Sequence, residues 1–200
     1  MILDYNRIYS KYLNNFNDGC KRAFENFEGV PPILKDSMQY AVLDGGKRIR
    51  PVLCFATAEM LGVSCERVKE FAVAIELIHS YSLVHDDLPS MDNDDYRRGK
   101  LSTHKKFGEA YGILAGDALL NYAFEVCLNK QDFDLLDAEA LKILASCAGC
   151  SGMIAGQILD LQNENKVDFV DNRYSPLYRS YLSEKAENSD KILLYQVGDF

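Results

Sequence analysis

Apolar side chains recur at intervals of three and four residues along most of the chain, which is the spacing of an amphipathic α-helix. Strict alternation of apolar and polar residues, the mark of a half-buried strand, occurs over no useful length. Glycines and prolines fall in short connections, and no repeat or linker divides the chain, so we predict a single all-α helical bundle over residues 1–200. The expected helices are 2–26, 33–44, 51–61, 66–86, 109–129, 135–150 and 151–164.

The expected helix 66–86 is unusually apolar. Between Phe71 and Val84 its only charged residue is Glu76, which predicts burial around almost its whole circumference. His79 and Asp86 are seven residues apart, two helical turns, and so share a face. A lone histidine on such a helix is more often a core residue than a ligand, but here the same face ends in a cluster of acids.

That cluster places five aspartates within ten residues, followed at once by two arginines. Carboxylates this close repel one another and would hold protons unless a cation neutralises them. Mg²⁺ is usually held by one or two carboxylates together with substrate phosphates, and the planar fork of arginine suits phosphate oxygens. The combination indicates a site for a diphosphate. The residues are Asp86, Asp87, Asp92, Asp94, Asp95, Arg97 and Arg98.

Two other interpretations of the acidic cluster deserve comparison. A calcium loop that begins at Asp92 would need an oxygen ligand at its fifth position and glycine at its sixth, where the chain has Tyr96 and Arg97. The second alternative is an acidic loop that is simply solvated, and the cluster by itself does not exclude it.

A basic cluster lies upstream, in the connection between two expected helices. Gly45 and Gly46 are a plausible helix stop, and Pro51 suits the first turn of the next helix. A solvated basic turn is the alternative for this segment alone, but its combination with the acidic cluster is far more specific. The basic residues are Lys47, Arg48 and Arg50, of which Arg48 is expected to face solvent or an acidic neighbour.

With these motifs in this order, the chain resembles the short-chain trans-isoprenyl diphosphate synthases, the polyprenyl synthetase family that includes farnesyl and geranylgeranyl diphosphate synthases. The resemblance covers about residues 35–162 and implies an all-helical bundle around a deep central cavity. Two extra residues in the first aspartate motif, Pro89 among them, are typical of the bacterial farnesyl type in that family. The matching motifs are Gly45-Gly-Lys-Arg-Ile-Arg-Pro51, Ile78-His-Ser-Tyr-Ser-Leu-Val-His-Asp-Asp-Leu-Pro-Ser-Met-Asp92, Arg97-Arg-Gly99, Thr103-His-x-x-Phe-Gly-Glu-Ala110, Leu114-Ala-Gly-Asp-Ala-Leu119 and Gly156-Gln157.

The resemblance implies a prenyl transfer. An allylic diphosphate, dimethylallyl or geranyl, would lose pyrophosphate, and isopentenyl diphosphate would attack the resulting cation to give farnesyl diphosphate. Mg²⁺ is the implied cofactor, coordinated by Asp86 and Asp92 with support from Asp87. Arg97 would contact the allylic diphosphate. The residues implied for isopentenyl diphosphate are Lys47, Arg50, His79 and Arg98.

Product length should depend on what closes the hydrocarbon pocket. Tyr81 stands five places before Asp86, where an aromatic residue is typical of farnesyl synthases in the family, and Ser82 lies one turn before Asp86. A bulky ring there would stop the growing chain at fifteen carbons, because overfilling packed space is unfavourable. A geranylgeranyl diphosphate synthase is the alternative. On a later helix Gln157 and Asp160 face the same way, and Gln157 is implied near the allylic chain; an exposed polar stripe is the other interpretation.

Composition agrees with a cytoplasmic enzyme. A hydrophobic fraction of 48% supports a substantial core, and a net charge of -8 argues against nucleic-acid binding. We expect no membrane span and no signal peptide, because no uncharged apolar run approaches about 20 residues. Six scattered cysteines suit reduced thiols, and Cys147 and Cys150 lack the second pair of a zinc ribbon.

The resemblance ends in the last third of the chain. From Asp168 onward there is neither the family's Lys-Thr stretch nor its second aspartate motif. A truncated product, a fragment and a subunit that needs a partner are all compatible with this, and exposed apolar surface would favour a homodimer. The rival functions are an inactive or regulatory subunit and a terpene cyclase. The intact diphosphate-binding residues oppose the first, and a cluster for a second diphosphate opposes the second.

Overall fold

The computed structural model describes residues 4–25, 27, 29–43 and 45–163, and the chain forms two compact units, Met1–Ala148 and Gly149–Phe200. The expectation of one domain over 1–200 stays a prediction, and the divergent segment 168–200 lies outside the described residues. The first unit contains α1 (Tyr5–Glu25), α2 (Pro32–Leu43), α3 (Ile49–Met60), the 3₁₀ turn η1 (Cys65–Val68), α4 (Lys69–Asp86), β1 (Tyr96–Arg97), β2 (Lys100–Leu101), α5 (Thr103–Phe107), α6 (Glu109–Leu128) and α7 (Leu135–Ala148). In the second unit α8 (Met153–Asn163) is described by itself.

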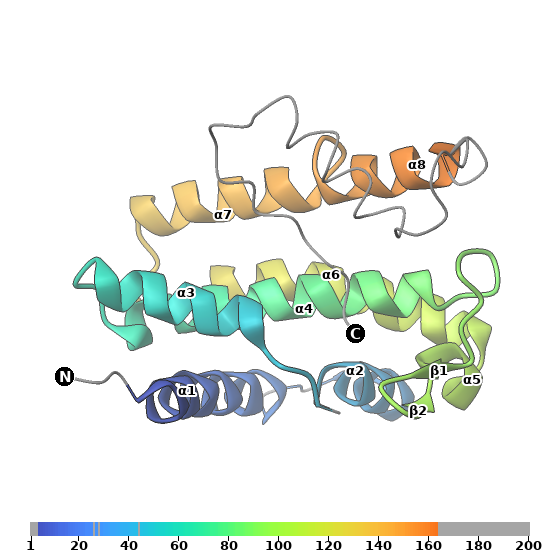
Figure 1. Cartoon of the computed structure of the whole chain (residues 1–200), viewed down its shortest axis with the longest axis horizontal. Coiled ribbons are helices and arrows are strands. Elements are labelled where there is room, and N and C mark those ends of the chain that lie inside the picture. The colour runs from blue at the N-terminus through green and yellow to red at the C-terminus, as the bar shows by residue number, and fades with distance from the viewer. Residues whose placement is uncertain (1–3, 26, 28, 44, 164–200) are drawn as a thin grey trace. The chain divides into compact units, whose positions relative to one another are not determined.

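The first unit is built around α4. Helices α1 and α2 form one layer, and α3, α4 and α6 form the next (Figure 1). The most extensive packing is between α4 and α6, and α7 contacts both of these helices. The predicted all-α fold is confirmed.

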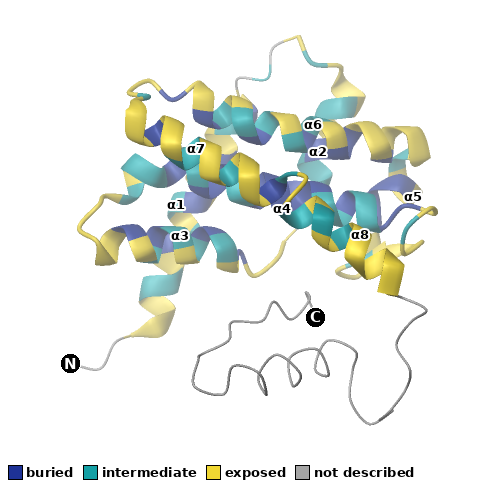
Figure 2. Ribbon diagram, turned by 90° about the horizontal axis from the view of Figure 1, so that it is seen from above, coloured by how far each residue is buried: buried dark blue, intermediate teal, exposed yellow. Residues whose placement is uncertain are grey.

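Burial follows the apolar pattern of the sequence. Buried residues lie mainly where the helices face one another, and exposed residues lie on the outer faces (Figure 2). Helix α4 contributes the most, as its lack of charge predicts. The largest fully buried side chains are Phe16 on α1, Met38 on α2, Phe55 on α3, Leu77 on α4 and Leu119 on α6.

Glycine lets α6 approach the end of α4 closely. A Cβ atom at Gly116 would lie 2.1 Å from Nε2 of His85, which is far inside van der Waals contact. The same imidazole nitrogen is 3.1 Å from the carbonyl oxygen of Ile113. The Ala-Gly-Asp part of the motif around Gly116 therefore fixes where the last turn of α4 lies.

A buried ion pair joins the basic loop to α4. Arg48 donates from Nη1 to Oε1 of Glu76 at 2.7 Å and from Nη2 to the carbonyl of Val42, and its guanidinium lies 5.3 Å from the centre of the Phe16 ring. The side chains of Arg48 and Glu76 are only 5% and 3% exposed. The expected acidic neighbour of Arg48 is thus Glu76, the only charged residue between Phe71 and Val84.

A second polar network holds the start of α7. The Asp137 side chain, 4% exposed, accepts from Arg67 Nη1 at 2.5 Å, from Lys130 Nζ at 3.4 Å and from the backbone N–H of Asp134 at 3.0 Å. Burial alone would raise the pKa of Asp137, but these donors outweigh it and hold that pKa below its usual value.

Acid should therefore weaken the fold through Asp137. Because its pKa is lowered in the folded state, Asp137 stabilises the protein above the unfolded pKa of about 3.9, and this contribution is lost as the pH falls through the folded pKa. We expect Asp137→Asn to lower the free energy of unfolding in urea clearly at pH 7 and much less at pH 3. The exposed Asp36→Asn is the control. A difference that is unchanged between the two pH values would contradict the assignment.

The structure differs from the expected elements at three places. Helix 66–86 begins as η1, because the Oγ of Ser64 accepts from the N–H of Arg67 and tightens the first turn. The antiparallel pair of β1 and β2 and the short helix α5 were not predicted. Two-residue strands leave no alternation to detect.

One stretch bears on the expectation of no membrane span. Residues Leu135–Asn163 pass a test of length and composition alone, because an 18-residue window within them has a mean hydropathy of 1.3. One such stretch is weak evidence, since turn residues at 149–152 separate α7 from α8. Neither helix reaches the roughly 20 residues that a span needs. The absence of a span stays a prediction.

Candidate functional site

The acidic loop folds back on the end of α4. The backbone N–H of Asp92 donates to the carbonyl of Asp86 at 2.9 Å, and Met91 and Asn93 both donate to the carbonyl of Leu88. Asn93 adopts a φ of 55°, a left-handed conformation that asparagine tolerates better than most residues. The loop thus returns Asp92 to Asp86, at a helix C-terminus whose dipole already favours cations.

Asp87 is committed to a different partner. Its side chain is 3% exposed and accepts from Nε of Arg97 at 2.9 Å and also from Nη2 of the same guanidinium. Burial raises the pKa of Asp87 above its ordinary value, and the contacts with Arg97 offset this only in part. Arg97 is also 3.6 Å from Asp94, while Asp95 forms an ion pair with Lys105 at 2.7 Å. The five aspartates therefore divide into different roles.

The hairpin brings the second arginine to the basic loop. Arg98 and Gly99 form its turn, with φ of 54° and 77°. Arg98 donates to the carbonyl of Gly45 at 2.9 Å, and a Cβ atom at Gly46 would lie 2.7 Å from Nη1 of Arg98. Two segments about fifty residues apart in sequence thus meet. Glycine at 46 is required both for its φ of 109° and for the space that the guanidinium occupies.

The other implied ligands come from the basic loop, α3 and α4. Lys47 is exposed on the loop, and Arg50 is half-buried in the first turn of α3. The N-terminus of a helix generally favours an anion. His79 and Tyr81 are buried on α4, at 7% and 6% exposure. The Oγ of Ser82 donates to the carbonyl of His79 at 2.9 Å, so this hydroxyl bonds back to the preceding turn of α4.

Two supporting contacts were not foreseen. The hydroxyl of Tyr9 donates to the carbonyl of Lys47 and so ties the basic loop to α1. Lys105 anchors the acidic loop through Asp95. Neither pairing leaves a local signal, since each joins segments that only the fold brings together.

The acidic loop offers carboxylate oxygens, the ligands that hard divalent cations prefer. Within the described part of the chain, no three histidine, cysteine, aspartate or glutamate side chains gather closely enough to hold a metal by themselves. Mg²⁺ commonly takes one or two carboxylates and completes its shell with water and phosphate oxygens. The backbone hydrogen bond from Asp92 to Asp86 brings these two acidic residues to the same end of α4, and their expected role as Mg²⁺ ligands stays a prediction.

Comparison with known proteins identifies the family. The profile of the polyprenyl synthetase family matches residues 31–185, which is most of the chain and extends past the expected limit near residue 162. The chain belongs to the polyprenyl synthetase family. Its described helices agree with those of a solved geranyltransferase from Legionella pneumophila, with a TM-score of 0.76, 34% identity, and coverage of 88% of this chain and 62% of that one.

Curated relatives belong to the same group of prenyl diphosphate synthases, but their names give two different products. A farnesyl diphosphate synthase from Micrococcus luteus is 50% identical over 155 residues, which cover 78% of this chain and 52% of that protein. A geranylgeranyl diphosphate synthase from Cyanophora paradoxa is 48% identical over 143 residues, covering 70% and 47%. The chain spans about half the length of the curated relatives that it matches.

Two further residues of the expected site lie on α8, at the end of the described chain. Gln157 and Asp160 lie three residues apart on α8, as expected. Because α8 belongs to the second unit, the role of Gln157 near the allylic chain stays a prediction.

Proposed function

We propose that the chain is a trans-prenyltransferase polypeptide of the farnesyl diphosphate synthase type, which joins isopentenyl diphosphate to dimethylallyl or geranyl diphosphate. One observation carries the proposal: Arg98 donates to Gly45, so that the two basic segments meet beside the aspartate loop. A reaction between two diphosphates needs two anion sites close together, and a protein with a single diphosphate substrate would not need the second cluster.

The proposed roles follow from these contacts. Asp86 and Asp92 would hold Mg²⁺, which when bound neutralises the leaving pyrophosphate. Asp87, which already accepts from Arg97, orients that guanidinium toward the allylic diphosphate. We assign isopentenyl diphosphate to the surface at the start of α3 and the hairpin turn. Its proposed ligands are Lys47, Arg50, His79 and Arg98.

Charge stabilisation is the chemical demand on this site. Ionisation of the allylic substrate places charge on pyrophosphate oxygens, and fixed cationic groups stabilise it without reorganising during the reaction. Arg97 suits this role because its position is set by the buried Asp87 before substrate binds. The basic cluster would hold the second substrate so that its double bond faces the allylic carbon.

The direct test is incubation of the 200-residue chain with Mg²⁺, labelled isopentenyl diphosphate and geranyl diphosphate, followed by chain-length analysis. A labelled fifteen-carbon diphosphate is the expected product. Binding of geranyl diphosphate, measured by calorimetry with Mg²⁺ and with EDTA, tests the site independently of turnover. Absence of both product and Mg²⁺-dependent binding would refute the proposal.

Product length should respond to Tyr81. The ring is buried with its edge against His85, at 5.8 Å between ring centres, so its removal opens space on α4 one turn before the acidic end. We expect Tyr81→Ala to shift the main product from fifteen to twenty or more carbons, read as a ratio of products that does not depend on the folded fraction. Tyr111→Ala, an exposed ring on α6, should leave the ratio unchanged. An unchanged ratio in Tyr81→Ala would remove Tyr81 from this role.

We also propose that the protein works in the cytoplasm as a homodimer. Large apolar side chains are exposed on α6 and α7, among them Leu114 at 55%, Leu135 at 85% and Ile143 at 64%. Large exposed apolar side chains gathered on neighbouring helices would suit an interface between two copies of the chain. Sedimentation velocity at micromolar concentration would give the state of assembly.

A further inference from the structure

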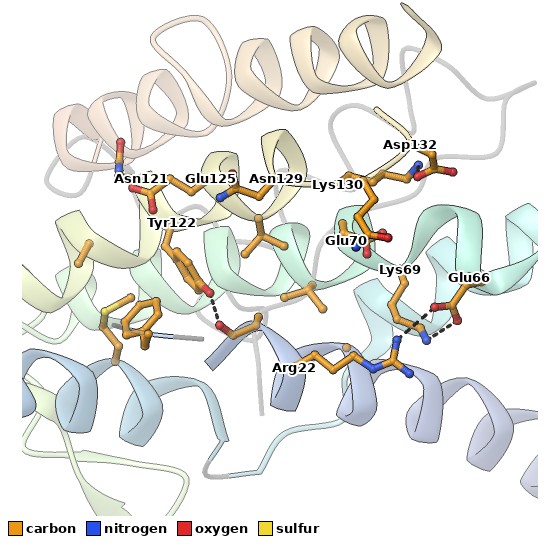
Figure 3. Close-up of a pocket in the computed structure, with 18 of the residues that line it drawn as sticks. Arg22, Glu66, Lys69, Glu70, Asn121, Tyr122, Glu125, Asn129, Lys130 and Asp132 are labelled. Atoms are coloured by element: carbon orange, nitrogen blue, oxygen red, sulfur yellow. Dashed lines mark hydrogen bonds and ion pairs between the residues drawn. The ribbon is translucent and has the colours of Figure 1, made fainter. Parts of the chain in front are cut away.

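A cavity of about 960 Å³ among α1, α2, α4 and α6 lies apart from the proposed reaction (Figure 3). It is lined by the first two turns of α4, whereas the aspartate loop follows the end of that helix. Each basic side chain that lines it is already paired with a carboxylate, so this region is held together by its own ion pairs. The pairs are Arg22 and Lys69 with Glu66, Arg67 with Asp134 and Asp137, and Lys130 with Asp132 and Asp137.

A much smaller cavity, of about 40 Å³, lies at the proposed diphosphate site itself. Asp87, Arg97 and Arg98 line it, and so does Tyr40. Tyr40 comes from α2 and is half-buried, whereas the other three belong to the proposed site. A tyrosine from a separate helix therefore stands beside the groups that would hold the two diphosphates.

Tyr40 contacts the hairpin and α5 through both its hydroxyl and its ring. The hydroxyl donates to the carbonyl of Leu101, on β2, at 2.8 Å. Nζ of Lys106 lies 3.6 Å from the centre of the ring, within the range of a cation–π interaction, and the ring of Phe107 packs edge to face with the two centres 5.5 Å apart. Tyr40 thus joins α2 to two segments that come much later in the chain.

The hairpin depends on such outside contacts for its position. Its strands have two residues each, and an isolated hairpin is at best marginally stable in water. Arg97, on β1, is held by the buried Asp87. Arg98 lies in the turn between Arg97 and Lys100, which pair across the hairpin, so a displacement of β2 moves Arg98 with it.

The end of α2 holds the hairpin at two points. The Tyr40 hydroxyl binds the carbonyl of Leu101, and the carbonyl of Gly45, just beyond the helix, accepts from Arg98 at 2.9 Å. The same segment leads directly into the basic loop that carries Lys47. Two points of attachment fix an orientation that one point leaves free. The placement of Arg98 relative to the basic loop is therefore set by Tyr40 as well as by Gly45.

We propose that Tyr40 is a positioning residue for isopentenyl diphosphate, whose hydroxyl fixes the hairpin so that Arg98 and the basic loop bind the same diphosphate. This role rests on the proposed function of the chain. Arg97 has a separate anchor in Asp87, so the allylic diphosphate should depend on Tyr40 much less. Loss of the hydroxyl should therefore lower the affinity for one substrate and spare the other.

The test is calorimetry of the full chain with isopentenyl diphosphate and, separately, with geranyl diphosphate and Mg²⁺. Tyr40→Phe keeps the ring and removes only the hydroxyl. It should weaken binding of isopentenyl diphosphate about three- to tenfold, the scale of one hydrogen bond, and change binding of geranyl diphosphate by less than about twofold. Tyr111→Phe makes the same change on an exposed tyrosine of α6 and should leave both affinities unchanged. Equal losses for the two substrates in Tyr40→Phe, or no loss for isopentenyl diphosphate, would overturn the proposal.

A double variant shows whether Tyr40 acts through Arg98. Once Arg98→Met has removed the guanidinium, adding Tyr40→Phe should cause no further loss of affinity for isopentenyl diphosphate. A further loss of the same size would mean that the hydroxyl acts on the fold in general, and would overturn the positioning role. If the unsubstituted chain binds neither diphosphate, the proposed function fails and the role of Tyr40 fails with it. Binding by the unsubstituted chain that Tyr40→Phe leaves intact refutes only the role of Tyr40.

Discussion

Asp86→Asn is expected to lower prenyl transfer by about 10² to 10³-fold, the scale found when one strong electrostatic contribution is removed from a transition state. The substitution keeps the shape of the side chain and removes the anionic oxygen at the end of α4. Asp92→Asn should cause a loss of similar size. The backbone N–H of Asp92 donates to the carbonyl of Asp86, so the two residues lie at the same end of the loop. Initial rates with geranyl and isopentenyl diphosphate, measured across a Mg²⁺ titration, give the result.

The same loop provides a matched control. Asp95→Asn makes an identical chemical change, but Asp95 is paired with Lys105 at 2.7 Å and is 54% exposed. It should retain most of the rate and the same Mg²⁺ requirement. Calorimetry adds a readout that does not need turnover: Asp86→Asn should remove the part of geranyl diphosphate binding that depends on Mg²⁺, and Asp95→Asn should not. Similar losses in both variants would mean that the loop acts only through its overall charge.

The helices could be predicted because their cause is local. Apolar spacing and the glycine and proline breaks placed α2 and α7 within two residues of their observed starts and ends. The buried character of α4 followed from its lack of charge. Its start was less accurate, because the choice between a 3₁₀ turn and an α-helical turn at Cys65–Val68 depends on one capping hydroxyl, that of Ser64.

The site could be foreseen in its residue types but not in its contacts. Sequence order gives Asp87 and Arg97 as neighbours in one motif, yet only the fold shows that each is the other's buried partner. The hairpin that turns Arg98 onto Gly45 depends on two consecutive left-handed residues, and Gly99 was the only local hint.

Arg48 shows how a weak sequence signal gains meaning from the structure. Glu76 is a single acid in the apolar middle of α4, and a buried carboxylate needs a counterion. Arg48 is the one basic residue of its loop that was not assigned to a substrate. The two observations are the two halves of the buried pair between Arg48 and Glu76. Arg48 also holds a left-handed backbone conformation, with a φ of 47°, at the start of α3. The contact between Arg48 and Glu76 therefore positions Lys47 in the loop and Arg50 in the first turn of α3.

Removing one half of this pair should strongly destabilise the protein. Arg48→Met leaves the Glu76 carboxylate buried without a counterion and the Val42 carbonyl without its donor, which typically costs about 3–5 kcal/mol in the free energy of unfolding. Urea denaturation followed by circular dichroism measures the loss. Lys11→Met breaks an exposed ion pair to Glu59, a 2.6 Å contact between α1 and α3, and should change stability little.

A double variant separates charge burial from loss of contacts. Arg48→Met with Glu76→Leu removes both charges and fills the space with apolar atoms, so it should recover most of the stability lost in Arg48→Met. Recovery of folding without recovery of isopentenyl diphosphate binding would show that the pair fixes the basic loop in addition to neutralising charge. If the double variant is as unstable as Arg48→Met, the buried Glu76 charge is not the cause of the loss, and the cause lies in the contacts that Arg48 makes with Val42 and Phe16.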